Sequence, residues 1–209
     1  MDGRAGGRKR GRSRARDSVT IPIMKIVILD RDGVINEDSP NFIKSVAEWH
    51  PVPGSLEGIA LLCQAGFRVF IASNQSGIGR GLLDETRLGE IHGRMRRLLE
   101  DDGALLGPIY HCPHLPAAEC GCRKPRPGLV QQAARELTFD PRACVVIGDK
   151  ACDVQLGQAL GARSILVRTG YGAEQASLCG DQADAVVDDL MASVDIVRRW
   201  LAAPAPVGR

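Results

Sequence analysis

Short apolar runs that alternate with helix-like segments constrain the fold of this chain more than any other feature. The run at residues 25–29 (KIVIL) is almost entirely apolar and β-branched, which is typical of a strand buried on both faces of a parallel sheet. Similar runs predict strands at 68–72, 143–148, 163–167 and near 184–187. Because helical segments separate them, the sequence predicts an α/β fold with a mostly parallel sheet.

The segments between the strands carry helical signals. Apolar side chains recur at helical spacing from Leu56 to Cys63, after Pro53 and Gly54, and Gly66 marks the end of this helix. Further helices are predicted at 84–101 with Asp84 as cap, at 127–137 with Pro127 in the first turn, at 153–160 and at 190–202. Residues 109–127 carry cysteines, histidines and prolines, and we expect them to form a loop.

The two ends of the chain differ from its body. The 209 residues suit one domain, predicted at 24–203, with a frayed end at 204–209. Residues 1–17 hold seven basic and two acidic side chains, which gives a net charge of +5. The whole chain has a net charge of +2, so the rest of the chain has a net charge of −3. We expect residues 1–23 to be a disordered basic extension, or to lie upstream of the true start, since Met24 directly precedes the first strand. Contact of this tail with RNA or anionic lipid is the weaker alternative.

Charge, hydropathy and cysteine usage exclude several classes of protein. The mildly acidic body shows no nucleic-acid footprint. No apolar run approaches the ~18 to 20 residues of a membrane span, and no secretory signal is visible, so we expect a cytoplasmic protein. The seven cysteines are odd in number, which argues against a disulfide framework.

Acidic side chains follow two of the predicted strands. Asp30 and Asp32 stand two apart at the end of the first strand, where their side chains can point the same way. Ligands of an open parallel sheet bind at this edge, and paired acids there need a cation or a proton between them. Asp149 follows a later strand and completes an oxygen site suited to Mg²⁺. The alternatives are a polar turn for the pair and a helix cap for Asp149 or Asp153.

Groups that can bind phosphate stand near the same edge. The segment 73–77 (SNQSG) directly follows the second strand, and its hydroxyls and backbone N–H groups can cradle phosphate oxygens, although a plain polar loop explains it about as well. Arg123 and Lys124 supply a planar guanidinium and a point charge. Lys150 could also reach a phosphate. A solvated basic turn is the alternative for Arg123 and Lys124.

Three cysteines and a histidine crowd into eleven residues. Cys112, His114, Cys120 and Cys122 match a Cys₃His structural zinc site, with four protein ligands and no open position. His111 is an alternative nitrogen ligand, and incidental packing of buried cysteines is the other explanation. We expect a structural zinc ion that holds the loop carrying Arg123.

The order of these segments resembles the haloacid-dehalogenase-like phosphatase superfamily. The resemblance rests on LDRDGVIN at 29–36, EWHPVPGSLEGI at 48–59, SNQSGIGRG at 73–81, CPH with CGCRKPRPG within 112–128, and GDKACD at 148–153. Within the superfamily these motifs are similar to the heptose-1,7-bisphosphate 7-phosphatase family of the histidinol-phosphatase-like branch, over roughly residues 25–190. The resemblance implies a Rossmann-like core, a small zinc-binding loop at 109–126 and no large cap domain.

The resemblance also implies roles for individual residues. Asp30 would be the nucleophile and Asp32 the general acid and base, with Mg²⁺ held by Asp30, the backbone carbonyl of Asp32, and Asp149. Ser73, where relatives often carry Thr, and Lys124 would steady the transferring phosphoryl group. The implied substrate contacts are Asp38, Ser39, Pro40, Asn41, Asn74, Gln75, Ser76, Arg123 and Lys150. The implied zinc ligands are Cys112, His114, Cys120 and Cys122.

The implied activity is Mg²⁺-dependent removal of the C7 phosphate of D-glycero-D-manno-heptose 1,7-bisphosphate through an aspartyl-phosphate, a step toward ADP- or GDP-heptose and lipopolysaccharide. The alternative enzymes are a histidinol-phosphate phosphatase, which shares the zinc loop, and another small sugar-phosphate phosphatase. A zinc-stabilised binding module would not need Asp30, Asp32, Asp149 and Lys124 together. We expect a monomer whose partner is a phosphorylated sugar, with no nucleic acid and no membrane.

Overall fold

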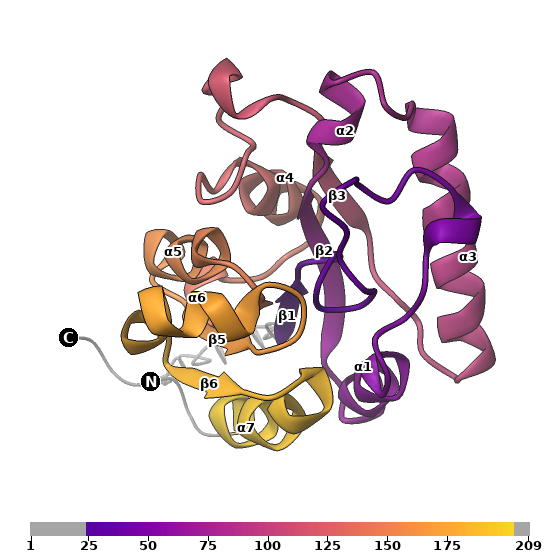
Figure 1. Cartoon of the computed structure of the whole chain (residues 1–209). Coiled ribbons are helices and arrows are strands. Elements are labelled where there is room, and N and C mark those ends of the chain that lie inside the picture. Colours follow the sequence, from indigo (N-terminus) through magenta and orange to yellow (C-terminus); the bar gives the residue numbers. More distant parts are fainter. Residues whose placement is uncertain (1–23, 203–209) are drawn as a thin grey trace, which may run out of the picture.

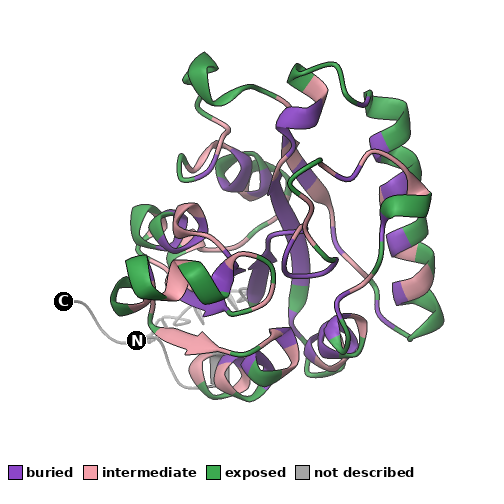
Figure 2. Cartoon of the chain, viewed as in Figure 1, coloured by how far each residue is buried: buried purple, intermediate pink, exposed green. Residues whose placement is uncertain are grey.

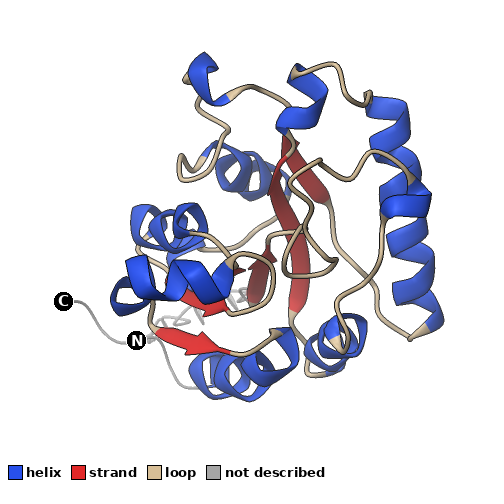
Figure 3. Cartoon of the chain, viewed as in Figure 1, coloured by secondary structure: helices blue, strands red, loops and turns tan. Residues whose placement is uncertain are grey.

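The computed structural model of the protein describes residues 24–202, so the basic tail predicted at 1–23 and the frayed end at 204–209 lie outside the described residues. A six-stranded parallel sheet in the order β3-β2-β1-β4-β5-β6 lies between helices (Figures 1 and 3). The strands are β1 (Ile26–Leu29), β2 (Arg68–Asn74), β3 (Ile109–Cys112), β4 (Val145–Gly148), β5 (Arg163–Val167) and β6 (Ala185–Val187). The predicted α/β fold is confirmed.

Helices cover both faces of the sheet. One face carries α1 (Ser55–Gln64), α3 (Glu85–Asp101) and α7 (Leu190–Ala202), and the other carries α4 (Gly128–Glu136) and α5 (Ala151–Leu160). The shorter α2 (Ser76–Gly79) and α6 (Gly172–Cys179) follow β2 and β5, and 3₁₀ turns lie at Val46–Glu48, Pro116–Ala118, Pro141–Ala143 and Gly180–Gln182. In Figure 2 the buried colour dominates the central strands, whereas β6 is intermediate and the outer helix faces are largely exposed.

The two larger hydrophobic clusters result from the alternation of side chains along the strands, and a third, small one contains Val154, Leu166 and Cys179. Val27 and Leu29 pack toward α1, α3 and α7, whereas Ile26 and Ile28 pack toward α4 and α5. Successive side chains of a strand point to opposite faces, so a strand covered on both sides must be apolar throughout. All four residues of β1 are at most 1% exposed, which explains why the sequence run is continuous rather than alternating.

The longest helix follows its local sequence closely. The carboxylate of Asp84 accepts the backbone N–H of Arg87 at 2.8 Å and satisfies a donor of the first turn of α3. Its buried residues recur every three or four positions: Leu88, Ile91, Met95 and Leu99. The prediction for this helix, including its cap, is confirmed.

The segment 109–127 was wrongly predicted to be a loop throughout. Its first four residues form β3, which pairs in parallel with Ile71–Asn74 of β2. Tyr110 and Cys112 are buried while His111 is only half-buried, a two-residue alternation too short to be distinguished among cysteines and prolines. The helices α2 and α6 were also not predicted, because both are short and carry little apolar periodicity.

Truncation of a buried residue on α3 should test this packing. Ile91 is 0% exposed within the core between α3 and the sheet. Ile91→Ala should lower the free energy of unfolding by about 2–5 kcal/mol, because it removes buried methylene groups and leaves a cavity. Arg94→Ala on the exposed side of the same helix is the control and should change it by less than about 0.5 kcal/mol in urea denaturation. Equal losses in both variants would contradict the described packing.

Candidate active site

Three buried carboxylates meet at the point where the order in which the chain adds strands to the sheet reverses. The chain passes from β1 outward to β2 on one side and later to β4 on the other, and ligands of such sheets bind at the carboxyl ends of these strands. Asp30 follows β1 and Asp149 follows β4, while Asp153 lies in the first turn of α5. One carboxylate oxygen of each residue lies within 4.8 Å of one such oxygen of the other two.

A buried lysine joins two of these acids. Lys124 is 3% exposed, and its Nζ lies 3.0 Å from Asp30 Oδ1 and 2.6 Å from Asp153 Oδ1. Burial opposes its charge, but Asp153 and Asp30 outweigh this and raise the pKa of Lys124 above its usual value. Asp30 Oδ1 also accepts the backbone N–H of Arg31 at 2.7 Å. One oxygen of Asp30 is therefore anchored twice.

Asp149 has the environment of a group that needs a cation. It is 0% exposed, and burial together with the charges of Asp30 and Asp153 raises its pKa to about 7, although Lys150 opposes the shift. Burial also raises the pKa of Asp153. Three carboxylates outnumber the two lysines beside them, and hard oxygen ligands at this spacing suit Mg²⁺. The described side chains therefore fit a divalent cation.

Glycines leave room for the carboxylate of Asp149. Gly33 has φ +84° and Gly170 has φ +58°, and a Cβ at either position would overlap Asp149 Oδ2. Thr169 Oγ1 donates to the carbonyl of Gly33 at 2.6 Å, and the backbone N–H of Tyr171 donates to Asp149 Oδ2 at 3.0 Å. The turn after β5 thus holds the loop after β1 and the carboxylate after β4 together.

Asp32 lies beside the carboxylate cluster rather than inside it. Its two oxygens accept Arg31 Nη2 at 2.8 and 2.9 Å, Asn36 Nδ2 at 2.8 Å and Gln75 Nε2 at 2.8 Å. Burial opposes ionisation, but the charge of Arg31 and the hydrogen bonds from Asn36 and Gln75 lower the pKa of Asp32 below its usual value. The charge of Arg31 and these hydrogen-bond donors therefore favour the carboxylate form of Asp32.

The acids open into a pocket of about 280 Å³. Besides Asp30, Asp32 and Ser73, most of the predicted substrate contacts line it: Asp38, Ser39, Pro40, Asn74, Gln75, Arg123 and Lys150. Asn41 lines an adjoining pocket instead, and Ser76 lies buried in α2 without reaching the lining. Lys150 Nζ lies 2.6 Å from Asp38 Oδ2, which links the loop after β1 to the start of α5.

The loop after β3 is tied to the site directly after its last cysteine. Asn74 at the end of β2 accepts the backbone N–H of Lys124 at 3.0 Å and donates to its carbonyl at 3.2 Å. Arg123 Nη1 donates to the carbonyl of His114 at 3.4 Å. These contacts hold Lys124 beside Asp30, although the two residues lie far apart in the sequence.

Three cysteines and His114 form the second candidate metal site. The Sγ atoms of Cys112, Cys120 and Cys122 are 3.2–3.5 Å apart, and His114 Nδ1 lies 3.2 Å from Cys122 Sγ. A tetrahedron with Zn–S bonds of ~2.3 Å has sulfur–sulfur edges of roughly 3.8 Å, so these donors could surround one zinc ion after a slight expansion. His111 lies outside the group and pairs with Glu85 at 3.0 Å.

Comparison with known proteins agrees with this geometry. The chain is 43% identical over 159 residues to a D-glycero-beta-D-manno-heptose-1,7-bisphosphate 7-phosphatase of Neisseria meningitidis, covering 76% of this chain and 85% of the relative. It is 41% identical over 169 residues to the protein of that name from Pseudomonas putida, covering 81% and 97%. The chain belongs to the heptose-1,7-bisphosphate 7-phosphatase family.

Structural similarity supports the same family. The solved D,D-heptose 1,7-bisphosphate phosphatase of B. bronchiseptica, complexed with magnesium and phosphate, is 41% identical, with a TM-score of 0.80 over 84% of this chain and 99% of that one. A family model described as HAD-hydrolase-like matches residues 121–193. As a member of the heptose-1,7-bisphosphate 7-phosphatase family, the chain has the haloacid-dehalogenase-like fold that its motifs predicted. Among residues 24–202, no helix is long and apolar enough to cross a membrane.

Sequence reasoning missed four residues that line the pocket of this family member: Phe42, Ile43, Cys152 and Tyr171. Phe42 has φ +64°, which is uncommon for an aromatic residue, and the guanidinium of Arg80 lies 5.6 Å from its ring. Tyr171 follows the unpredicted turn after β5. Apolar residues beside the acidic motif could have been noticed at 42–43, whereas nothing local marks Tyr171.

Substitution of Gly170 should test the packing around Asp149. In Gly170→Ala the new Cβ would overlap Asp149 Oδ2, so Mg²⁺ binding measured by calorimetry should weaken by at least about tenfold. Gly103→Ala is the matched control, because Gly103 has φ +76° and no atom near the added Cβ. Both variants should lose about 1–2 kcal/mol of stability through backbone strain. Unchanged Mg²⁺ affinity in Gly170→Ala would contradict the described contact.

Proposed function

We propose that this chain removes the C7 phosphate of D-glycero-D-manno-heptose 1,7-bisphosphate and releases heptose 1-phosphate. The observation that carries the proposal is the buried Asp30 carboxylate, anchored by Lys124 at 3.0 Å and facing a pocket beside Asp149. The relatives named for this activity share 41–43% of the aligned residues, and their names specify the beta anomer. We therefore propose the β anomer as the preferred substrate.

We assign Mg²⁺ to the side chains of Asp30 and Asp149 and to the backbone carbonyl of Asp32. Asp153 belongs to the same carboxylate cluster, but its oxygens accept Lys124 Nζ at 2.6 Å and the backbone N–H of Lys150 at 3.2 Å. We therefore assign Asp153 to positioning Lys124 and capping α5. When bound, Mg²⁺ supplies positive charge that stabilises the oxygens of the transferring phosphoryl group.

Asp30 is proposed as the nucleophile. Its Oδ1 is anchored by the N–H of Arg31 and by Lys124, so we assign the attack to Oδ2. An O–P bond forms to Asp30 while the bond to the sugar oxygen breaks, and Asp32 gives its proton to that oxygen. Water then attacks phosphorus, Asp32 takes a proton from it, and the Asp30 carboxylate is restored.

The proposed double role of Asp32 requires two protonation states. The observed contacts with Arg31, Asn36 and Gln75 stabilise the carboxylate, which is the form that the hydrolytic second step needs. A protonated Asp32 would lose part of these interactions. Gln75 Nε2 also donates to Ser73 Oγ at 2.9 Å, so Gln75 links Asp32 to the residue proposed to bind the phosphoryl group.

Other lining residues are assigned to the phosphoryl group and the sugar. Ser73, 1% exposed at the end of β2, and Lys124 would bind the oxygens of the transferring group. We assign sugar and distal phosphate contacts to Asp38–Asn41, Asn74–Ser76, Arg123 and Lys150. We further propose that the enzyme is a monomer and that it works in the cytoplasm in heptose metabolism.

The cysteine cluster is proposed to hold a structural zinc ion. Four protein donors would leave no position for substrate, and the cluster precedes Arg123 and Lys124 directly in the chain. The ion would hold the loop in one conformation. Placing Lys124 beside Asp30 would then cost less conformational entropy. This role differs from that of Mg²⁺, which would contact the reacting phosphate.

Replacement of the nucleophile is the first test. Asp30→Asn should lower phosphate release from β-heptose 1,7-bisphosphate by about three orders of magnitude or more, because an amide cannot form the acyl phosphate. Lys124 keeps its partner Asp153 in this variant, so the melting temperature should stay near that of the unmodified protein. Asp101→Asn on the exposed side of α3 is the control. A variant that retains more than a few per cent of the rate would refute the assignment.

Metal analysis should distinguish the two sites. Elemental analysis of the full chain should find about one zinc per chain, and Cys120→Ser should lower zinc content and melting temperature more than it lowers Mg²⁺ affinity. Cys63→Ser removes a half-buried thiol outside the cluster and serves as the control. A fully stable protein without zinc would show that the cluster has no structural ion.

Replacement of Arg123 should test recognition of the second phosphate or the sugar hydroxyls. A charge-assisted hydrogen bond is worth roughly 1.5–3 kcal/mol, so Arg123→Ala should lower kcat/KM for the bisphosphate about ten- to a hundredfold. A small aryl phosphate should show hardly any loss. Arg126→Ala is the matched control, since Arg126 is exposed and does not line the main pocket. Equal losses on both substrates would instead place Arg123 at the reacting phosphate.

A further inference from the structure

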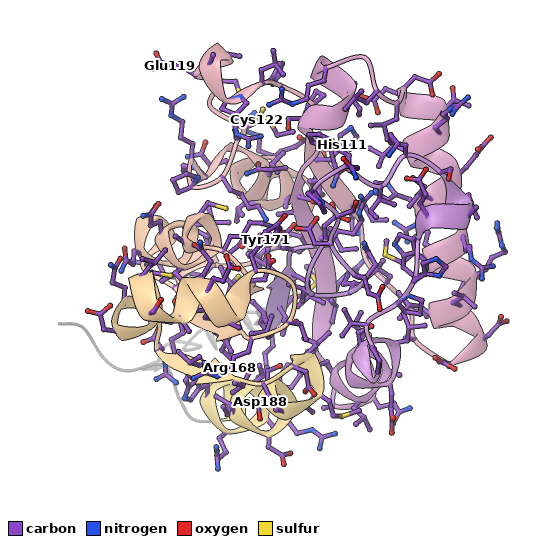
Figure 4. All side chains as sticks on the ribbon, in the orientation of Figure 1. His111, Glu119, Cys122, Arg168, Tyr171 and Asp188 are labelled. Carbon is purple, nitrogen blue, oxygen red and sulfur yellow. The ribbon has the colours of Figure 1, made fainter. Side chains whose placement is uncertain are left out.

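Tyr171 has no role in the activity as proposed so far, although it lies in the pocket. It follows Gly170 directly before α6 and lines the pocket together with Asp30 and Lys150. Figure 4 labels it near the middle of the view, between α6 and the part of the chain that carries β1 and β2. Its backbone N–H donates to Asp149, so its side chain is directed by a turn that is already fixed at the site.

The ring of Tyr171 faces an ammonium group. Lys150 Nζ lies 5.0 Å from the ring centroid, within the range of a cation–π interaction. The same Nζ lies 2.6 Å from Asp38 Oδ2 and 3.2 Å from Asp149 Oδ2. Lys150 is thus shared between one carboxylate on the far wall of the pocket, one carboxylate of the buried cluster, and one aromatic face.

A cation at Asp149 changes this balance. If Asp149 binds Mg²⁺, as the proposed function requires, the divalent charge would stand next to an ammonium group 3.2 Å from the same carboxylate. Like charges at such a separation repel, so the bound cation would weaken the contact of Lys150 with Asp149. The remaining observed partners of its Nζ are Asp38 and the ring of Tyr171.

We propose that Tyr171 is a positioning residue whose ring holds the ammonium of Lys150 beside Asp38 and away from Asp149. This position leaves Asp149 free for the cation and places the ammonium of Lys150 where it can contact the sugar substrate. The inference rests on the proposed function for the identity of the cation and the substrate. It concerns only the side chain, because the backbone N–H of residue 171 that donates to Asp149 is kept when Tyr171 is replaced by Leu or Phe.

Binding of the metal alone tests the first half of the proposal. Tyr171→Leu removes the aromatic face, so the ammonium of Lys150 should interact more strongly with Asp149. The Kd of Mg²⁺ measured by calorimetry should therefore rise about two- to fivefold. Tyr171→Phe keeps the face without the hydroxyl and should restore the affinity of the unmodified protein. An unchanged Kd in Tyr171→Leu, or an equal loss in Tyr171→Phe, would overturn the proposal.

A double-mutant cycle tests whether Tyr171 acts through Lys150. Tyr171→Leu should lower kcat/KM for β-heptose 1,7-bisphosphate about three- to tenfold, mainly through KM, and more than it does for an aryl phosphate. In a Lys150→Met background the same change should have no further effect, because the cation is gone. Additive losses would show that Tyr171 acts independently of Lys150 and would overturn the proposal.

The two measurements also separate this inference from the function on which it rests. If the unmodified protein releases phosphate from neither substrate, the proposed function fails. The Mg²⁺ titrations of Tyr171→Leu, Tyr171→Phe and Lys150→Met then still decide the inference. Lys150→Met should bind Mg²⁺ at least as tightly as the unmodified protein, and Tyr171→Leu should not weaken binding further in that background. A further loss there would contradict positioning through Lys150.

Discussion

The mutual repulsion of three buried carboxylates is the constraint on which the rest of the structure depends. Asp30, Asp149 and Asp153 are 6, 0 and 1% exposed, and burial of such charges is strongly unfavourable unless cations compensate them. Lys124 and Lys150 supply part of the compensation, and the remaining deficit fits a divalent ion. The surrounding elements can be understood as the means of holding these five side chains at one edge of the sheet.

The backbone around the cluster serves the same requirement. The register that pairs Leu29 with Ile147 brings the ends of β1 and β4 level, so the acids that follow them meet. Glycines at 33 and 170 leave the space that the carboxylate of Asp149 occupies. Asn74 makes two hydrogen bonds to the backbone of Lys124 and so positions its ammonium beside Asp30, which is far away in the sequence. If the cysteine cluster anchors the loop, less conformational entropy is lost when Lys124 is placed beside Asp30.

The chemistry of the site could be predicted from the sequence because each reactive side chain stands next to a recognisable strand end. Asp30 and Asp32 follow KIVIL, and Ser73 is the last residue but one of the strand that begins at Arg68. The pocket wall could not be predicted in the same way. Tyr171 follows no motif, Phe42 takes a left-handed backbone conformation, and β3 is too short for its alternation to be distinguished from a loop. Asn41 and Ser76 carry suitable groups, but the backbone directs them elsewhere.

The sequence by itself determined the layering of the fold and the set of reactive groups, because periodicity and strand-end polarity are local properties of the chain. Only the tertiary structure decided how those groups are shared. Asp153 accepts Lys124 rather than standing alone as a cap, Asp32 turns toward Arg31 and Gln75, and Lys150 lies between Asp38, Asp149 and Tyr171. These partnerships join residues far apart in the chain, and they follow from strand register and packing, which no local pattern encodes.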